Sequence, residues 1–122
     1  MADPIFDKKD QLEQIKPMLI EGEQLDAVFD LKGTGTGFLA VTSKRLIVYD
    51  KAFLRKMKAV VSVPYSRILS VGAEDENNVL LGRGFFSTSK LAIKTSDNEY
   101  DFEFRGADKA HLAHRLILTR LL

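Results

Sequence analysis

The sequence predicts a mostly β protein with a helix at each end, built as a small β-sandwich or partly open β-barrel of about seven antiparallel strands. Short apolar stretches alternate with polar residues between residues 24 and 105, and turn residues separate them. Apolar residues take helical spacing only before and after this region. With 122 residues, the chain is long enough to bury roughly 65% of its unfolded surface in one core. We therefore expect one compact domain, with residues 1–23 as a helical extension of a β domain at 24–122.

The first helix is predicted near residues 7–19. Leu12, Ile15 and Leu19 recur at helical spacing among charged residues. Asp7 is a suitable N-cap, and Pro17 should kink the helix or end it near Lys16. Its narrow apolar stripe and mixed charges favour packing on its own domain.

Residues 24–32 alternate as in a half-buried strand, with Leu25, Ala27, Phe29 and Leu31 on the buried side. The GTGTG stretch at 33–37 follows. We interpret it as a turn rather than a phosphate cradle, because a phosphate loop needs a following helix and the pattern here continues as a strand.

The clearest element is a hairpin at residues 37–50 with Ser43 and Lys44 as its turn. Cross-strand pairing then places Phe38 opposite Tyr49 and Ala40 opposite Ile47. One face is purely aliphatic and should be core; it consists of Leu39, Val41, Leu46 and Val48. The other face is also too apolar to be left to water, so we expect either the N-terminal helix or another subunit to cover it.

This second face supplies the candidate oligomer or partner surface. It consists of Phe38, Ile47 and Tyr49, together with Pro64 at the end of a β-branched strand near 59–63. Because proline cannot donate to a strand ladder, that strand should lie at a sheet edge or end at a bulge.

Residues 51–58, KAFLRKMK, form the most basic segment. Cations interleaved with apolar residues attract anionic lipid surfaces. The candidate anion or membrane patch is Lys44, Arg45, Phe53, Arg55, Lys56 and Lys58. The alternative is a solvated loop whose Phe53 packs into the core.

The second half is predicted to contain a strand at 68–72, an acidic loop at 74–78, a bent strand at 79–89 and a hairpin formed by 90–95 and 99–105. After Gly106 a helix should begin, with Asp108 as a plausible cap and a broad apolar face. His111 and His114 have a spacing that suits metal ligands, but the sequence offers no third ligand.

Composition limits the function further. A net charge of +1 with interspersed Lys and Arg argues against nucleic acid as a partner. Without cysteine, the chain has no disulfide, thiolate zinc site or cysteine nucleophile. We find no candidate catalytic, cofactor or metal residues, and no secretory signal or membrane-spanning stretch, so we expect a non-enzymatic cytoplasmic protein.

Several short segments resemble the bacterial pleckstrin-homology (PH) domain family. They are Glu21 to Glu23, Thr42 to Ile47 with Tyr49 in the hairpin, and Val63 to Tyr65 with Ile68. The resemblance implies a PH-like fold, no enzymatic activity, and a ring-like homo-oligomer. Phosphoinositide-binding PH domains carry basic residues along the first two strands, whereas this chain has Lys32 and then none before Lys44. We therefore expect no phosphoinositide specificity.

Two functional hypotheses follow. The first is a PH-like scaffold that self-associates and engages a protein or peptide partner that the sequence does not identify. The second is a peripheral binder of anionic membranes at the inner membrane face, through the basic segment at 51–58.

Overall fold

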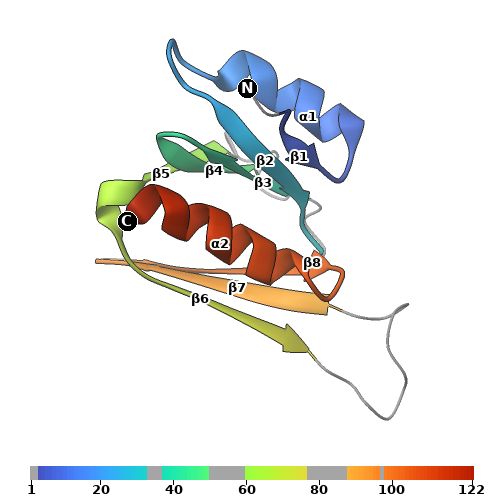
Figure 1. The fold of residues 1–122 in the computed structure, drawn as a ribbon, viewed down its shortest axis with the longest axis vertical. Coiled ribbons are helices and arrows are strands. Elements are labelled where there is room, and N and C mark those ends of the chain that lie inside the picture. Colours follow the sequence, from blue (N-terminus) through green and yellow to red (C-terminus); the bar gives the residue numbers. More distant parts are fainter. Residues whose placement is uncertain (1–2, 33–36, 50–59, 77–87, 97) are drawn as a thin grey trace. The chain divides into compact units, whose positions relative to one another are not determined.

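The computed structural model describes residues 3–32, 37–49, 60–76, 88–96 and 98–122. They form two compact units, residues 1–65 and 66–122 (Figure 1). The protein is mostly β with a helix near each end, as predicted. The described residues contain eight strands, where about seven were expected. The first unit contains β1 (Ile5–Phe6), α1 (Lys9–Ile15), the 3-10 turn η1 (Lys16–Met18), β2 (Leu25–Asp30), β3 (Phe38–Thr42), β4 (Arg45–Tyr49) and β5 (Val60–Pro64).

The first unit is built on one five-stranded sheet with the order β1-β2-β3-β4-β5. Strand β1, which the sequence did not predict, pairs with β2 in parallel, and the other neighbours are antiparallel. The predicted hairpin is confirmed in register, with Phe38 opposite Tyr49 and Ala40 opposite Ile47. Its aliphatic face is buried as expected. Strand β5 is the last strand of this sheet, so Pro64 lies on an edge strand, as predicted.

Strand β2 differs from its predicted pattern. The alternation predicted a half-buried strand, but Val28 is fully buried and Asp30 is 6% exposed. A register shift between Leu25 and Ala27 interrupts the alternation. Because a bulge changes which face a side chain occupies, Leu25 joins Val28 rather than Ala27 in its packing cluster. Both faces of β2 are therefore covered.

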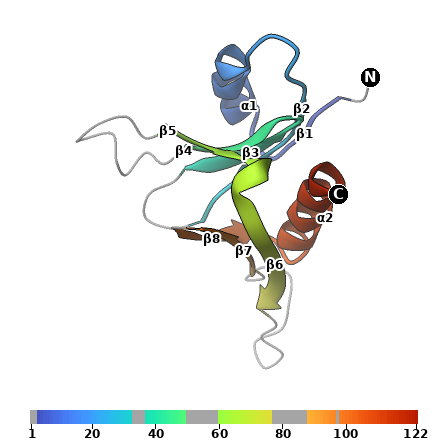
Figure 2. The same ribbon diagram turned by 90° about the vertical axis from the view of Figure 1, so that its left-hand side faces the viewer.

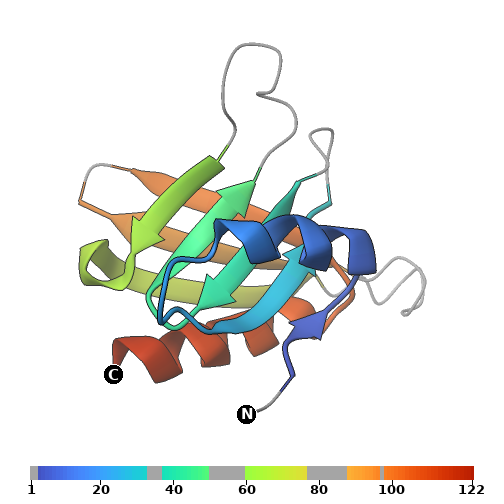
Figure 3. The ribbon, with the colours of Figure 1, turned by 90° about the horizontal axis from the view of Figure 1, so that it is seen from above.

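Helix α1 covers the second face of the hairpin. Leu12 and Ile15 pack in one cluster with Phe38, Ala40 and Ile47, and α1 lies across one face of the sheet (Figures 2 and 3). Of the two covers that the sequence left open, the structure shows the helix of the same chain. The helix ends at Ile15 and passes into η1, close to the predicted end.

The predicted cap of α1 is wrong. The N-cap residue is Lys8, and no side chain caps the helix there. Asp7 instead accepts a hydrogen bond at 2.9 Å from the backbone N–H of Asp30. Its carboxylate therefore joins the entry of α1 to β2 rather than closing the first helical turn.

The second unit contains the 3-10 turn η3 (Tyr65–Arg67) at its boundary, β6 (Ile68–Glu76), β7 (Thr88–Thr95), β8 (Glu99–Arg105) and α2 (Lys109–Leu121). Its antiparallel sheet has the order β6-β7-β8. Strand β6 continues to Glu76, so the loop predicted at 74–78 begins later than expected. The bent strand predicted at 79–89 lies mostly outside the described residues, and β7 starts at Thr88 rather than Lys90.

Helix α2 packs on one face of this second sheet (Figure 1). Asp108 occupies the N-cap position, as predicted, but makes no side-chain cap hydrogen bond. Ser89 replaces it: its hydroxyl accepts from the backbone N–H of Ala110 at 2.9 Å and donates to the carbonyl of Gly106 at 2.8 Å. Gly106 has a φ of 117°, a conformation that glycine adopts without strain. The start of α2 is thus fixed to β7.

Candidate functional site

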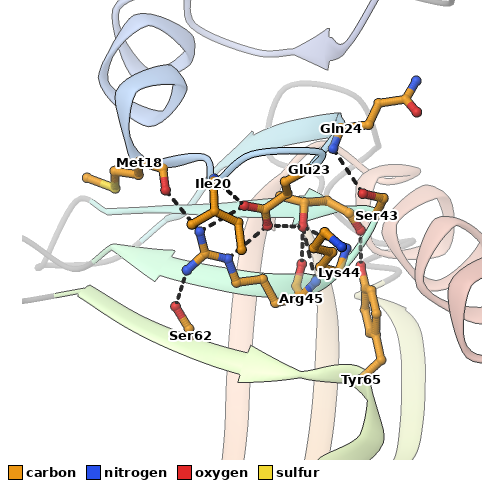
Figure 4. A network of polar contacts seen from close by, with 10 residues as sticks. Met18, Ile20, Glu23, Gln24, Ser43, Lys44, Arg45, Ser62 and Tyr65 are labelled. Carbon is orange, nitrogen blue, oxygen red and sulfur yellow. Dashed lines mark hydrogen bonds and ion pairs between the residues drawn. The ribbon is translucent and has the colours of Figure 1, made fainter.

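The densest polar cluster of the first unit surrounds an ion pair between Glu23 and Arg45 (Figure 4). The guanidinium binds the carboxylate through two bonds, from Nε to Oε2 at 2.8 Å and from Nη2 to Oε1 at 2.9 Å. The Glu23 side chain is fully buried, whereas that of Arg45 remains 20% exposed. We call Glu23, Thr42 and Arg45 the Glu23–Arg45 junction. Such two-pronged pairs are stronger and more directional than single contacts.

The remaining polar groups of the junction are also engaged. The Thr42 hydroxyl donates to Glu23 at 2.6 Å, and the backbone N–H of Ile20 donates to the same carboxylate at 3.0 Å. Arg45 donates further to the carbonyl of Met18 at 2.9 Å and to the hydroxyl of Ser62 at 2.7 Å. The junction therefore connects the end of η1, the start of β2, and strands β3, β4 and β5.

Thr42 also explains the turn of the hairpin. Two-residue hairpin turns favour Asn or Gly, so Ser43 and Lys44 are unusual there. The Thr42 hydroxyl accepts hydrogen bonds from the backbone N–H groups of Lys44 and Arg45, at 3.1 and 3.0 Å. A threonine side chain can replace a backbone acceptor in this way. The turn is thus held by the same side chain that meets Glu23.

The ion pair changes the acid–base behaviour of both partners. Hydrogen bonds from Arg45 lower the pKa of Glu23 from 4.5 to about 2, and the bonds from Thr42 and Ile20 act in the same direction. Hydrogen bonding to Glu23 raises the pKa of Arg45. Both groups therefore stay charged at neutral pH. A carboxylate held this firmly is a poor general base, because its affinity for a proton is low.

Two further contacts surround the junction. The Tyr65 hydroxyl donates to the carbonyl of Thr42 at 2.6 Å. Ser43 and Gln24 exchange two hydrogen bonds at 2.8 and 2.9 Å, which fasten the turn of the hairpin to the start of β2. The arrangement joins strands rather than presenting a reactive group. We therefore interpret the junction as a structural centre.

The four residues of the candidate oligomer surface lie in different environments. Phe38 and Ile47 are fully buried in the cluster with α1, so neither side chain reaches the surface of its own chain. Tyr49 is half-buried and stacks on Phe38 with ring centroids 4.7 Å apart. Pro64 is exposed on β5, where Val61 is 41% exposed.

The candidate membrane patch is only partly described. Lys44 is exposed at the tip of the hairpin, but the guanidinium of Arg45 is bound to Glu23. The other members lie outside the described residues; they are Phe53, Arg55, Lys56 and Lys58. Among the two candidate cations that the structure describes, Lys44 alone faces solvent.

The described residues contain no group of three or more His, Cys, Asp or Glu side chains that could hold a metal ion. His111 is exposed and His114 half-buried, three residues apart on α2. None of the helices described here is long and apolar enough to cross a membrane.

Solved structures define the class of fold. A DUF1696 family protein with a pleckstrin-homology domain from Shewanella loihica PV-4 matches with a TM-score of 0.61 and 22% identity, over 95% of this chain and 94% of that chain. The C-terminal domain of an unknown protein from Leishmania infantum matches with a TM-score of 0.57 and 18% identity, over 93% and 98%. The fold is therefore PH-like, with separate sheets that do not close.

The family follows from the sequence comparison. The model of the bacterial PH domain matches residues 11–118, and the chain belongs to that family. No curated protein matches significantly. Members of the PH-domain family are generally non-catalytic binding modules. The segments that carried the resemblance now have a physical role, since Glu23, Thr42, Arg45 and Tyr65 all lie in or against the Glu23–Arg45 junction.

No pattern in the sequence predicts this junction as a unit. Glu23 and Arg45 are 22 residues apart, and neither lies in a local chemical motif. The sequence contains one weak indication of the junction: the polar residues Thr42 and Arg45 lie at the end of an otherwise apolar hairpin face. Such residues need a buried partner of opposite chemistry.

Proposed function

We propose that this protein is a non-enzymatic scaffold that self-associates and engages a partner protein. The observation that best supports the engagement of a partner is the edge of the first sheet. Strand β5 is paired with β4 on one side, and the described residues place no strand on its other side. Val61 and Pro64 are exposed along it. Edge strands offer their backbone to an extended strand of another chain, which is a common mode of peptide recognition.

The chemistry of the first unit supports a binding role over catalysis. In the Glu23–Arg45 junction the carboxylate accepts bonds from Arg45, Thr42 and Ile20. The Thr42 hydroxyl donates its proton to the Glu23 carboxylate. Because the pKa of Glu23 is low, this carboxylate is a poor base for activating the hydroxyl as a nucleophile. The junction gives β5 a rigid support through Ser62 instead.

Self-association is tested by the solution mass, measured by light scattering after size exclusion. A multiple of 13.7 kDa is expected, and it should fall on dilution if the subunits exchange. A mass of 13.7 kDa at all concentrations would contradict self-association. The burial of Phe38 and Ile47 under α1 means that this association must use other surfaces of the chain.

Binding of anionic membranes is the second candidate, and the exposed Lys44 favours it. It places the protein in the cytoplasm, at the inner membrane face. Cosedimentation with vesicles that contain phosphatidylserine should then depend on salt and should weaken in Lys44→Glu. Lack of binding at low ionic strength would exclude this candidate.

A further inference from the structure

The second unit carries a hollow on the face of its sheet opposite to α2. The hollow has a volume of about 650 Å3 and is lined by residues from β6, β7 and β8. Ser89 contacts the start of α2, so Leu91, two residues later, shares the helix-facing side, while Lys90 and Ala92 point away from it. Gly72 pairs with Ala92 in the sheet. These two small residues form the floor of the hollow.

The rim of the hollow is mostly acidic. In the pairing of β6 and β8 with the central strand β7, Glu74 and Glu103 lie on either side of Lys90. Asp101 lies beside Ala92. Three carboxylates thus face one ammonium group. Glu74 and Asp101 are both exposed. A partner of opposite charge is therefore favoured there, because complementary potentials speed encounter and exclude partners of like charge.

Helix α2 carries the complementary surface on the same unit. Its sequence, KAHLAHRLILTRL, contains three Lys and Arg residues and no acidic residue. Ala110, Ala113 and Ile117 are its buried residues. Beside this buried side runs a stripe with spacings of four, three and four, which we call the α2 stripe: His111, Arg115, the half-buried Leu118, and Leu122 directly after the helix. Arg115 is exposed and Leu122 is 98% exposed.

We propose that the α2 stripe of one copy docks in the hollow of a second copy. A helix is about 10 Å wide, which is close to the distance of roughly 10 Å across three neighbouring strands. The small residues Gly72 and Ala92 let the helix approach, Leu118 lies over this floor, and Arg115 meets the carboxylates of Glu74 and Asp101. The inference rests on the proposed self-association and names the surfaces that carry it.

The two surfaces lie on opposite sides of one unit, so the contact is heterologous. Each copy presents one helix stripe and one hollow, and a heterologous contact propagates until it closes into a ring or continues as a filament. A 13-residue helix is only about 20 Å long, so each contact is small beside the ~800 Å2 per partner of standard interfaces. The association should therefore depend on concentration.

The experiment uses two charge reversals, one on each surface. Arg115→Glu removes the cation of the stripe, and Asp101→Lys reverses the rim of the hollow. Each variant alone is expected to have the 13.7 kDa mass of one chain. An equimolar mixture should associate again, because Arg115→Glu keeps an intact hollow, Asp101→Lys keeps an intact stripe, and the reversed charges at positions 115 and 101 attract each other. Recovery in the mixture also shows that both variants are folded.

Two further variants separate charge from shape. Gly72→Val fills the floor, and a Cβ at Gly72 meets no atom within 4 Å, so the fold should tolerate it while the assembly dissociates. Arg67→Glu is the matched control: an exposed arginine outside both surfaces, whose reversal should leave the mass of the assembly unchanged.

The outcomes distinguish the two levels of proposal. A monomeric wild type contradicts the proposed self-association and this interface with it. A wild type that assembles, with unchanged mass in Arg115→Glu or Asp101→Lys or with no association in their mixture, overturns the interface alone. Loss of binding to anionic vesicles in Arg115→Glu, in a monomeric wild type, would assign the stripe to a membrane instead.

Discussion

Replacement of Glu23 by glutamine removes the charge at the centre of the Glu23–Arg45 junction and keeps its shape. The pKa of Glu23 falls from 4.5 to about 2 in the folded chain. A difference of about 2.5 pKa units corresponds to about 3 kcal/mol. Because the Arg45 side chain is 20% exposed, solvent screens part of this energy, and we expect Glu23→Gln to destabilise the protein by about 2 kcal/mol.

The measurement is thermal and denaturant unfolding of both proteins near neutral pH. For a chain of this length, a loss of about 2 kcal/mol lowers the melting temperature by about 8 °C. Glu21→Gln is the matched control, since Glu21 is an exposed acid two residues earlier. It should change stability by less than about 0.5 kcal/mol.

The pH dependence gives a sharper test. The folded-state pKa of Glu23 lies below its unfolded value, so its stabilising contribution is complete above about pH 4.5 and is lost as the pH falls toward about 2. The stability difference between wild type and Glu23→Gln should therefore shrink across this window. A difference that stays constant down to pH 2, or equal effects of Glu21→Gln and Glu23→Gln, would refute this account of the junction.

Four other substitutions test the fold. Tyr65→Phe removes the hydrogen bond to the Thr42 carbonyl and should cost about 1 kcal/mol in unfolding free energy, with a neutral result contradicting it. Ile47→Ala should lower the unfolding free energy by about 2–4 kcal/mol, because Ile47 is fully buried under α1. Val61→Lys, on the exposed edge strand, should change it by less than about 1 kcal/mol. Equal losses in the two variants would exclude the cover of Ile47 by α1. Gly22→Ala should cost about 1 kcal/mol because Gly22 has a φ of 82°, although the space around it is open, and circular dichroism melts would detect this.

The sequence predicted local elements well where one physical rule decided them. The hairpin register came from two apolar runs and a two-residue gap, because side-chain alternation leaves few alternatives once both runs are apolar. The end of α1 came from Pro17, whose ring opposes continuation of a helix. Both predictions depend on neighbours in the chain.

Prediction failed where contacts between distant residues decided the outcome. The bulge at Leu25 and Ala27 breaks an alternation that looked regular in the sequence. Asp7 was assigned to a helix cap by its position, but a backbone N–H 23 residues away at Asp30 competes for its carboxylate. The same reason hid the pairing of Glu23 with Arg45, since no local pattern reports which buried charges meet.

The position of the Glu23–Arg45 junction bears on how function can vary in this fold. The junction holds the turn of the hairpin, the start of β2 and the adjacent β5 through contacts whose donors and acceptors are nearly all used. The junction residues belong to the segments that resemble the family, and their contacts stabilise the fold. They therefore indicate the scaffold and do not indicate the partner. In the proposed function, recognition depends on residues that the scaffold does not need, such as Val61 on β5, the rim at Glu74 and Asp101, and Arg115 on α2. Substitutions at these positions should change the partner or the assembly while leaving the melting temperature nearly unchanged, and that separation is the signature of a binding module.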